Sequence, residues 1–416
     1  MSEKKNLKPG WKIWRFDQMA TNVNVRIDNP AESGMEHYVG LEHLDSNSLK
    51  IRRWGTPDDV EATKLMFKEG DVIFGRRRAY QRKLGIAAFD GICSAHAMVL
   101  RAKPDVVLPE FLPFFMQSDL FMNRAVEISV GSLSPTINWK TMAVQEFALP
   151  PMDEQKRVAR ALSANENARH ALEDSLEQGE RLGRALTATL LGVNGERIVE
   201  NVIRGNATTT ETGIPIRRVS EICSKHRQGV QVGPFGGSVS SKYFVPDGVP
   251  VLKINNISKD FLIDLTDQVF VSEEHAKELG DRYRVQRGDL VTASQATIGR
   301  SALVPEELEG AVISQHLIRV APDPMLCLPS WLLLCFSSAL VVRQLHSVTQ
   351  GGTRAGLNTQ DVAGIRLPMP DVGTQKKMLL VIDEHRKSMS AIQSRLDQSI
   401  ELARAMNSEF MGCCSV

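Results

Sequence analysis

The sequence predicts an α+β chain in which two mixed α/β modules stand in tandem, separated by two long antiparallel helices that form a coiled coil. Three observations support this prediction. Landmark residues recur at a constant offset, each half of the chain ends in a long helical pattern with heptad spacing, and short apolar runs bounded by glycine and polar residues fill the remainder. We expect the two halves to be related by a pseudo-two-fold axis.

The internal repeat is visible as pairs of identical residues separated by 220 positions. A Gly-Asp pair also recurs at an offset of 218, so small insertions or deletions lie between the landmarks. So many matched positions indicate a duplication. The pairs are Ser94 and Ser314, His96 and His316, Leu108-Pro109 and Leu328-Pro329, Ser118 and Ser338, Gly131 and Gly351, Asn138 and Asn358, Gln155 and Gln375, Gly192 and Gly412, and, at offset 218, Gly70-Asp71 and Gly288-Asp289.

The globular part of each half combines strand and helix patterns. VIFGRR, AAFDGI and AHAMVLR in the first half are short apolar runs typical of strands, as are PVLKINNI, DLVTAS and HLIRVA in the second. LPEFLPFFMQSDLFMNRAVE and LPSWLLLCFSSALVVRQLHS each predict one buried helix, at matching places in the two halves.

A long helical pattern follows each module. No proline occurs from Glu154 to Leu191, and apolar residues recur every 3.5 residues on average, as in a coiled-coil seam. The polar residues Asn165, Arg169, His385 and Ser399 interrupt the seam, and such positions can fix its register. Two unrelated surface helices are the alternative. The residues assigned to helix pairing and partner docking are Val158, Leu162, Leu172, Leu176, Leu186, Leu190, Met378, Ile382, Met389, Ile392, Leu396, Met406 and Phe410.

These patterns divide the chain into five segments. A polar, threonine-rich stretch between the halves is interpreted as a linker. The segments are a first module over 1–152, a helix over 153–192, the linker over 193–213, a second module over 214–372 and a second helix over 373–412.

Composition sets limits on the class of protein. The net charge is +1, so nucleic-acid binding would require a local concentration of basic residues rather than bulk charge. Six cysteines without framework spacing indicate a reducing compartment, and neither a signal peptide nor an apolar run long enough for a membrane span is present, so we expect a cytoplasmic protein.

Motifs for chemistry are absent from the sequence. We find no phosphate-binding GxxxxGK[ST] loop, no methyltransferase tetrad and no convincing nuclease cluster. Glu154-Gln155-Lys156 mimics half of a nuclease motif, but acidic residues at a helix start are better explained by the helix dipole. His96 and His316 stand between apolar residues in expected strands, and we interpret them as structural. We expect no metal site and no cofactor on this chain.

One motif occurs twice, at the start of each long helix. It is LPPMDEQKRVARAL, followed by a helix ending in LLG, and its weaker copy is LPMPDVGTQKKM to FMG. This motif resembles the conserved region of the specificity subunits of type I restriction-modification systems. VGPFGGSVSSKYFVPDGVPVLKINNI is similar to the opening of a target recognition domain, and GGTRAGLN before DVAGIRLP also matches. The first half departs from the pattern, because it lacks a GPFGS-type segment.

The resemblance implies a non-catalytic DNA-binding subunit. Two target recognition domains would each read one half of a bipartite double-stranded DNA site, and the helices would set the gap between the half-sites. Methyltransferase subunits, usually two, would dock on the helices, and restriction/translocase subunits would join that core. S-adenosylmethionine, ATP and magnesium would bind only to those partners, and no membrane is involved.

Candidate DNA contacts lie in a few polar loops. RRRAYQRK at 76–83 is the densest basic cluster, and arginine, lysine and glutamine are the side chains that bind phosphates and base edges. The aligned loop ASQATIGR is less basic. A solvated basic loop is the alternative for each. The candidates are Arg76, Arg77, Arg78, Tyr80, Gln81, Arg82, Lys83, Lys225, Arg227, Gln228, Lys242, Tyr243, Ser294, Gln295, Thr297, Arg300, Thr353 and Arg354, with Arg52 and Arg53 as weaker ones.

Two other functions remain open from the sequence. A coiled-coil scaffold that ignores DNA would show no salt-dependent DNA affinity, whereas a DNA reader would lose affinity as salt rises. A recognition protein associated with a nuclease-methyltransferase outside a type I system is the second alternative. An enzyme of that kind needs a catalytic domain, and two modules and two helices already occupy the 416 residues.

Overall fold

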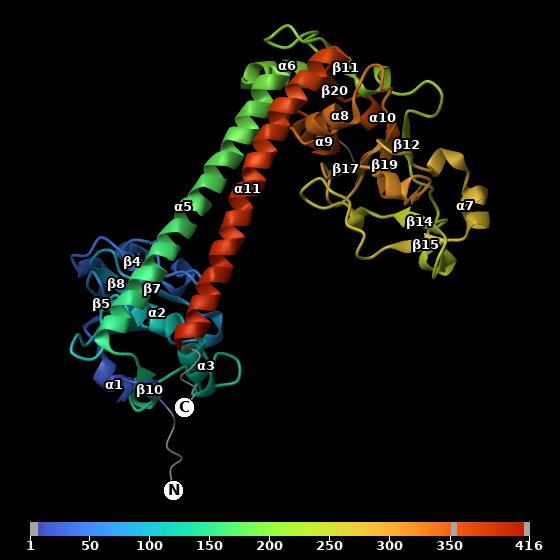
Figure 1. The fold of residues 1–416 in the computed structure, drawn as a ribbon. Helices are drawn as coiled ribbons and strands as arrows, with labels where there is room; N and C mark the ends of the chain where they lie inside the picture. Colours follow the sequence, from blue (N-terminus) through green and yellow to red (C-terminus); the bar gives the residue numbers. More distant parts are fainter. Residues whose placement is uncertain (1–6, 351–355, 412–416) are drawn as a thin grey trace. The chain divides into compact units, whose positions relative to one another are not determined.

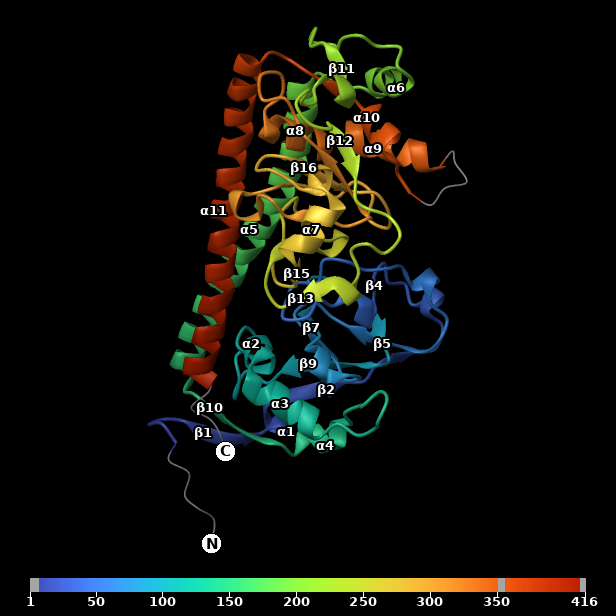
Figure 2. The same cartoon turned by 90° about the vertical axis from the view of Figure 1, so that its right-hand side faces the viewer.

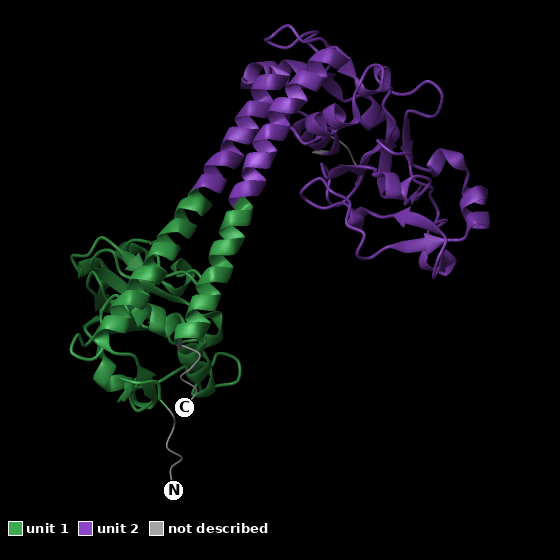
Figure 3. Cartoon of the chain, in the orientation of Figure 1, with its two compact units in different colours: residues 1–174, 393–416 green, residues 175–392 purple. Residues whose placement is uncertain are grey.

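The computed structural model describes residues 7–350 and 356–411, which form two compact units (Figures 1 and 3). Unit 1 contains residues 1–174 and 393–416, and unit 2 contains residues 175–392. The long helices α5 (Met152–Leu191) and α11 (Val372–Met411) each contribute a segment to both units. Each unit therefore consists of one globular module and one stretch of the helix pair.

Unit 1 contains two four-stranded sheets and a two-stranded ribbon. The main sheet has the order β2-β9-β6-β7 with all neighbours antiparallel. The second sheet has the order β3-β5-β8-β4, in which β4 and β8 are parallel, and the ribbon joins β1 to β10. The strands are β1 Lys12–Arg15, β2 Ala20–Val23, β3 Arg26–Ile27, β4 Tyr38–Val39, β5 Lys64–Phe67, β6 Val72–Gly75, β7 Leu84–Ile86, β8 Gly91–Ser94, β9 Ala97–Ala102 and β10 Glu146–Leu149.

Unit 2 repeats the main sheet and the ribbon of unit 1. Its main sheet has the order β12-β19-β16-β17, and its ribbon joins β11 to β20. The second sheet, β13-β15-β14-β18, differs, because β15 pairs with β14, whereas its counterpart β5 pairs with β8. The duplication is confirmed by the main sheet and the ribbon. The strands are β11 Ile216–Arg218, β12 Val230–Val232, β13 Phe244–Val245, β14 Val249–Leu252, β15 Val269–Val271, β16 Leu290–Ala293, β17 Ser301–Leu303, β18 Val312–Ile313, β19 Leu317–Val320 and β20 Arg366–Pro368.

Two buried glutamines make matching contacts at the start of the long helices. The Gln155 side-chain oxygen accepts the N–H of Leu108 at 2.9 Å, and the Gln375 oxygen accepts the N–H of Leu328 at 2.9 Å. Each side-chain nitrogen donates to the carbonyl five residues earlier in the chain. These bonds satisfy buried backbone groups, so the structure gives the EQK segment a structural role.

The Gly-Asp pairs also have matching structural roles. Asp71 and Asp289 are buried, and each accepts hydrogen bonds from an arginine on a neighbouring segment, Arg101 (2.7 and 2.8 Å) and Arg227 (2.8 Å) respectively. The preceding glycines have φ angles of 85° and 82°, which favour glycine. Each pair holds the turn that leads into the central strand β6 or β16.

The two apolar segments predicted as single helices are each broken into two. In the first, α2 (Leu112–Gln117) ends and α3 (Asp119–Glu127) begins at Ser118, whose hydroxyl donates to the carbonyl of Phe115 and accepts the N–H of Phe121. Ser338 makes the same pair of bonds between α8 (Pro329–Phe336) and α9 (Ala339–Gln350). A serine that caps a new helix therefore interrupts each apolar run.

The segment 193–213, interpreted as a linker, contains a packed helix. Residues Glu196–Arg204 form helix α6, in which Val199 and Val202 are buried in the core of unit 2. Arg366 donates to the carbonyl of Ile203 at 3.3 Å. The polar outer face of α6 concealed these valines, which are spaced three residues apart.

The helices α5 and α11 run antiparallel within each unit and lie side by side in both views (Figures 1 and 2). In unit 1, Asn165 donates to the carbonyl of Ser399 at 3.0 Å, and the Ser399 hydroxyl donates back to the Asn165 amide oxygen at 2.9 Å. In unit 2, Gly179 and Gly183 face Met389 and His385. The predicted antiparallel coiled coil is confirmed, and its thirteen assigned seam residues are all buried or half-buried.

Gly192 ends α5 with a φ of 67°, as expected for a helix stop, whereas Gly412 lies outside the described residues. Of the described helices, none taken singly has the length and apolar composition to cross a membrane; α8 and α9, bent by 62°, meet those two criteria only as a pair. The remaining α-helices are α1 Phe16–Met19, α4 Trp139–Ala143, α7 Glu273–Leu279 and α10 Thr359–Ala363.

Candidate nucleic-acid interface

One end of the main sheet gathers polar loops in both units. In unit 1, β2 and β6 end there and β9 and β7 begin there, because Gly75 pairs with Ala97 and Phe74 pairs with Leu84. In unit 2, β12 and β16 end there and β19 and β17 begin there. We call this end the loop edge of each unit. The basic segment 76–83 and the segment 294–300 both lie at a loop edge.

Three arginines at the loop edge of unit 1 are bonded only to neutral groups. Arg76 donates to the carbonyl of Ala95 at 3.1 Å, and Arg77 and Arg78 both donate to the Ser134 hydroxyl at 3.2–3.3 Å. Within the described ranges, none of the three forms an ion pair. Their positive charges therefore remain available to an anionic ligand such as a DNA phosphate.

A shallow pocket of about 260 Å³ lies beside these arginines. Arg77, Arg78 and Gln81 line it together with Ser94, His96, Leu41 and Glu42. Donors and acceptors from three separate loops thus meet at one place, which is the arrangement required to contact base edges.

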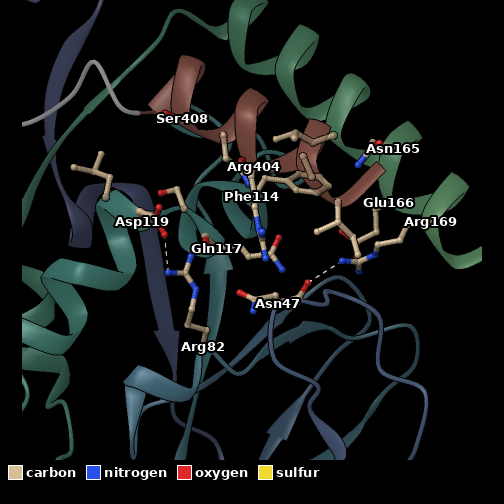
Figure 4. A pocket seen from close by; sticks show the side chains of 16 residues that line it. Asn47, Arg82, Phe114, Gln117, Asp119, Asn165, Glu166, Arg169, Arg404 and Ser408 are labelled. Atoms are coloured by element: carbon tan, nitrogen blue, oxygen red, sulfur yellow. Dashed lines mark hydrogen bonds and ion pairs between the residues drawn. The ribbon is translucent and has the colours of Figure 1, made fainter. Parts of the chain in front are cut away.

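Arg82 and Lys83 are already bonded to partners within unit 1. Arg82 forms an ion pair with Asp119 at 2.7 Å and donates to the carbonyl of Gln117 at 2.6 Å (Figure 4). Lys83 donates to the carbonyl of Leu41 at 2.8 Å. The structure therefore gives these two predicted contacts a role in holding the loop.

The Arg82 side chain borders a cavity of about 600 Å³ between the module and the helix segments of unit 1 (Figure 4). Arg169 lies on the far wall and donates to the carbonyl of Asn47 at 3.1 Å. Arg404 extends from α11 into the cavity and has no ion-pair partner among the residues described. The cavity faces the helices rather than the loop edge.

The loop edge of unit 2 is less charged. Gln295 and Arg300 are exposed, Thr297 is half-buried, and Ser294 is buried. The carbonyl of Arg300 accepts the N–H of Ala293 at 2.9 Å, which closes the loop. The exposed amide and guanidinium are groups that hydrogen-bond to bases and phosphates.

Other predicted contacts in unit 2 lie elsewhere. Lys225, Arg227 and Gln228 precede β12 and so lie at the opposite end of the sheet from the loop edge, and Arg227 forms a half-buried ion pair with Asp289. Lys242 lies over the ring of Tyr243 at 4.5 Å. The structure brings none of these together with the segment 294–300, and Thr353 and Arg354 lie outside the described residues.

The two matched histidines lie in turns rather than in strands, so their predicted place in a strand is wrong. His96 is exposed in the turn before β9, and His316 is half-buried in the turn before β19, so both lie at a loop edge. Partial burial and the nearby Arg77 and Arg76 guanidiniums lower the pKa of His96. The Gln315 amide nitrogen lies 3.0 Å from the second histidine ring.

Sequence reasoning also missed Ser134, which holds two arginines, and Phe235, which is exposed in the Gly-rich loop after β12. The glycines around Phe235 were the available signal. In the described ranges, no three His, Cys, Asp or Glu side chains are grouped to hold a metal ion. The described cysteines, Cys93, Cys223, Cys327 and Cys335, are free and buried.

Comparisons with known proteins agree with this architecture. The family described as "Type I restriction modification DNA specificity domain" matches residues 29–178 and 238–402. The Escherichia coli type I restriction enzyme EcoDI specificity subunit is 29% identical over 152 residues, which cover 36% of this chain and 33% of that relative. The match therefore spans one third of the relative's length.

Two solved structures share the fold. A chain from "Structural basis underlying complex assembly and conformational transition of the type I R-M system" has a TM-score of 0.60 and 18% identity, covering 98% of both chains. The type-I restriction-modification S subunit from M. genitalium has a TM-score of 0.57 and 12% identity, covering 99% of this chain and 98% of that one. At these identities the likeness establishes the fold.

Proposed function

Since this chain belongs to the family of type I restriction modification DNA specificity proteins, we propose that it is the sequence-reading subunit of such a system. Each unit reads one half of a bipartite double-stranded DNA site through its loop edge. The paired helices set the unspecified gap between the two half-sites. The chain itself makes and breaks no bond.

One observation carries this proposal. Both units have the same main sheet order, and in both units exposed or half-buried polar side chains from more than one loop lie at the same end of that sheet. Side chains on base edges specify sequence, while arginine and lysine on phosphates fix position. Arg76, Arg77 and Arg78 supply the positive charge in unit 1, and Gln295 and Arg300 supply hydrogen-bonding groups in unit 2.

Methyltransferase subunits would dock on the helix pair. Leu182 in unit 2 and Leu402 in unit 1 are separated by the repeat offset of 220, and their exposed fractions are 60% and 53%. Leu380 and Val381 are also exposed on α11. Covering these apolar side chains with a partner would be favourable because it removes them from water, and the repetition of the leucines favours two copies of the partner. Restriction/translocase subunits would join that core.

The chemistry would belong to these partners. S-adenosylmethionine for methyl transfer, and ATP with magnesium for translocation, would bind to the methyltransferase and restriction subunits respectively. This chain would need no cofactor of its own and would act in the cytoplasm. Its contribution is to position the partners on a defined DNA sequence.

The test is selection of duplexes from a random double-stranded DNA library by the full-length chain. We expect the enriched duplexes to share two short fixed sequences separated by a constant gap, and their affinity to fall steeply as salt rises. No enrichment would contradict DNA reading and would favour a protein scaffold instead.

The spacer role is tested in the same selection by lengthening both helices. One heptad is inserted between Asp174 and Ser175 and another between Ile392 and Gln393, so that both insertions lie at the boundary between the units and keep the heptad frame. Each insertion adds about 10 Å, so the gap should grow by about three base pairs. The half-site sequences should remain the same. An unchanged gap would contradict the spacer role.

A further inference from the structure

Three aromatic rings are largely exposed among the described residues, and two of them have no ring partner. Trp54 is 49% exposed but packs against His37 and Phe89 with centroid distances of 5.5 and 5.1 Å. Tyr80 and Phe235 are 54% and 70% exposed, and in the described chain neither contacts another ring or a cation. Both of these rings lie at a loop edge, one in each unit.

The backbone holds Tyr80 in a fixed position. Arg78 and Arg82, on either side of it, have φ angles of 58° and 53°, a conformation that is unfavourable for residues other than glycine. Ala79 is buried, and the N–H of Arg78 donates to the carbonyl of Pro135 at 2.8 Å. The surrounding contacts therefore stabilise a strained turn that exposes the tyrosine ring.

The loop that carries Phe235 is held at both ends. The N–H of Gly233 donates to the carbonyl of Leu317 at 2.9 Å, and the ring nitrogen of His275 donates to the carbonyl of Ser238 at 2.8 Å. The Ser238 hydroxyl donates to the carbonyl of Phe235 at 2.7 Å. The ring thus projects from an ordered turn, and little conformational entropy remains to be lost on binding.

The backbone that follows Phe235 carries no side chains at two positions and has open space beside it. Gly236 and Gly237 have φ angles of 75° and 72°, and a Cβ atom built on either would meet no atom within 4 Å. Open space combined with the absence of side chains lets another molecule approach the backbone closely. A contact between the ring edge and a thymine methyl needs no such approach, whereas insertion of the ring between bases does.

We propose that Tyr80 and Phe235 are stacking wedges, each of which inserts against a base in the half-site read by its own unit. This inference rests on the proposed function, since it assigns each ring to one half of the bipartite site. The two rings come from different loops, the β6–β7 loop in unit 1 and the loop after β12 in unit 2. Both units therefore place an exposed ring at the same end of the main sheet, although the two residues do not occupy matching positions of the repeat.

The experiment uses the full-length chain and the duplex enriched in the selection above. The fluorescent base 2-aminopurine, whose emission rises when it unstacks, replaces one adenine at a time in each half-site. We expect one position in each half-site to brighten on binding. Tyr80→Ala should abolish the signal in one half-site only, and Phe235→Ala should abolish it in the other.

Each alanine variant should also weaken binding by about tenfold or more, the range for loss of one base–aromatic stack. Tyr80→Phe and Phe235→Tyr should retain both signals, because they keep the ring. Ile13→Ala in unit 1 and Leu262→Ala in unit 2 remove exposed apolar side chains outside these loops and serve as matched controls.

Several outcomes would overturn the proposal. If bipartite binding occurs but no position brightens, the rings are not wedges, although DNA reading stands. If exchanging thymine for uracil reproduces the affinity loss of Phe235→Ala, the ring contacts a methyl group instead. If both alanine variants lose both signals together, the effect is general destabilisation. If no duplex is enriched, both the function and the wedges are refuted.

Discussion

The two units follow one plan but join their modules to the helices differently. In unit 1, the loop after β4 is bound to α5: Glu166 accepts the N–H of Leu49 at 2.8 Å, and Arg52 forms an ion pair with Glu173. In unit 2, the corresponding loop after β14 closes on itself, because the N–H of Ser258 donates to the carbonyl of Leu262 at 2.9 Å. Within the described part of unit 2, no hydrogen bond or ion pair joins residues 254–270 to α11.

The helix seam shows the same contrast. Unit 1 contains the hydrogen-bonded pair Asn165 and Ser399, whereas unit 2 brings Gly179 and Gly183 against larger side chains. The loop edges also differ in charge, since that of unit 1 has three arginines without an ion pair among the described residues, whereas the segment 294–300 in unit 2 has one arginine, Arg300. In the seam and in the attachment of the loop after β4, unit 1 therefore uses polar and charged groups, whereas the seam of unit 2 has close contacts at two glycines. A duplicated fold can thus keep its geometry while the interactions that maintain it diverge.

The largest expected difference between the units concerns DNA binding. Replacing Arg76, Arg77 and Arg78 together with alanine should weaken binding to the selected duplex by about 100-fold or more, because up to three charged contacts are lost. The slope of log affinity against log salt should become shallower by about 2.7 if all three contact phosphates. Replacing Gln295, Thr297 and Arg300 should change that slope by only about 0.9.

Fluorescence anisotropy over a range of salt concentrations measures both quantities. Circular dichroism and co-purification with partner subunits provide the controls, since neither should change. Equal slope changes in the two triple variants would contradict the contrast in charge. Loss of partner assembly with DNA binding intact would show that the arginine loop is not a DNA contact.

A smaller effect is expected in the helix seam. Asn165→Ala removes two hydrogen bonds and leaves Ser399 without its partner, which should lower the free energy of unfolding by about 1–2 kcal/mol. Gly183→Ala in unit 2 gains helix propensity of about 1 kcal/mol but requires movement of His385, whose ring nitrogen would lie 2.7 Å from the new Cβ. These terms oppose each other, so its net effect should be smaller.

Urea unfolding monitored by circular dichroism compares the two variants. The double variant Asn165→Ala with Ser399→Ala should lose less than the sum of the single losses, because the interaction is shared. A simple sum would mean that the two side chains do not stabilise each other.

The repeat could be predicted from the sequence because matched residues make matching hydrogen bonds in the two units, as Gln155 and Gln375 do. The heptad frame predicted the seam because its apolar residues pack in both units. Ser118 and Ser338 were missed as helix breaks, because a capping serine within an apolar run leaves the hydrophobic pattern unchanged. Helix α6 was missed because its buried valines are few.

The candidate site was predicted less completely than the fold. Arg76 to Arg78 lie at the loop edge, but composition could not distinguish them from Arg82. The partner of Arg82, Asp119, lies 37 residues later in the sequence, at the start of α3. Phe235 was missed because exposure of an apolar ring depends on the conformation of the surrounding loop. Distant partners and local backbone angles are tertiary properties, which spacing in the sequence does not encode.

The smallest predicted difference is the pH dependence of the loop bound to α5. Burial tends to raise the pKa of Glu173, but hydrogen bonds from Arg52 and His170, with the nearby Arg169, lower that pKa below its ordinary value. A carboxyl group whose pKa is lower in the folded state stabilises the fold above its unfolded pKa of about 4.5, and this stabilisation is lost as the pH falls through the folded value. Glu173→Gln should therefore reduce the urea midpoint at pH 7, and this deficit should shrink as the pH falls below 4.5. Exchanging the exposed Glu177 for Gln is the matched control, because its ion pair with Arg181 is exposed and contributes little. A Glu173→Gln deficit that persists unchanged at low pH would mean that the side chain acts through packing, and the contrast between a charged unit 1 and a packed unit 2 would not extend to this loop.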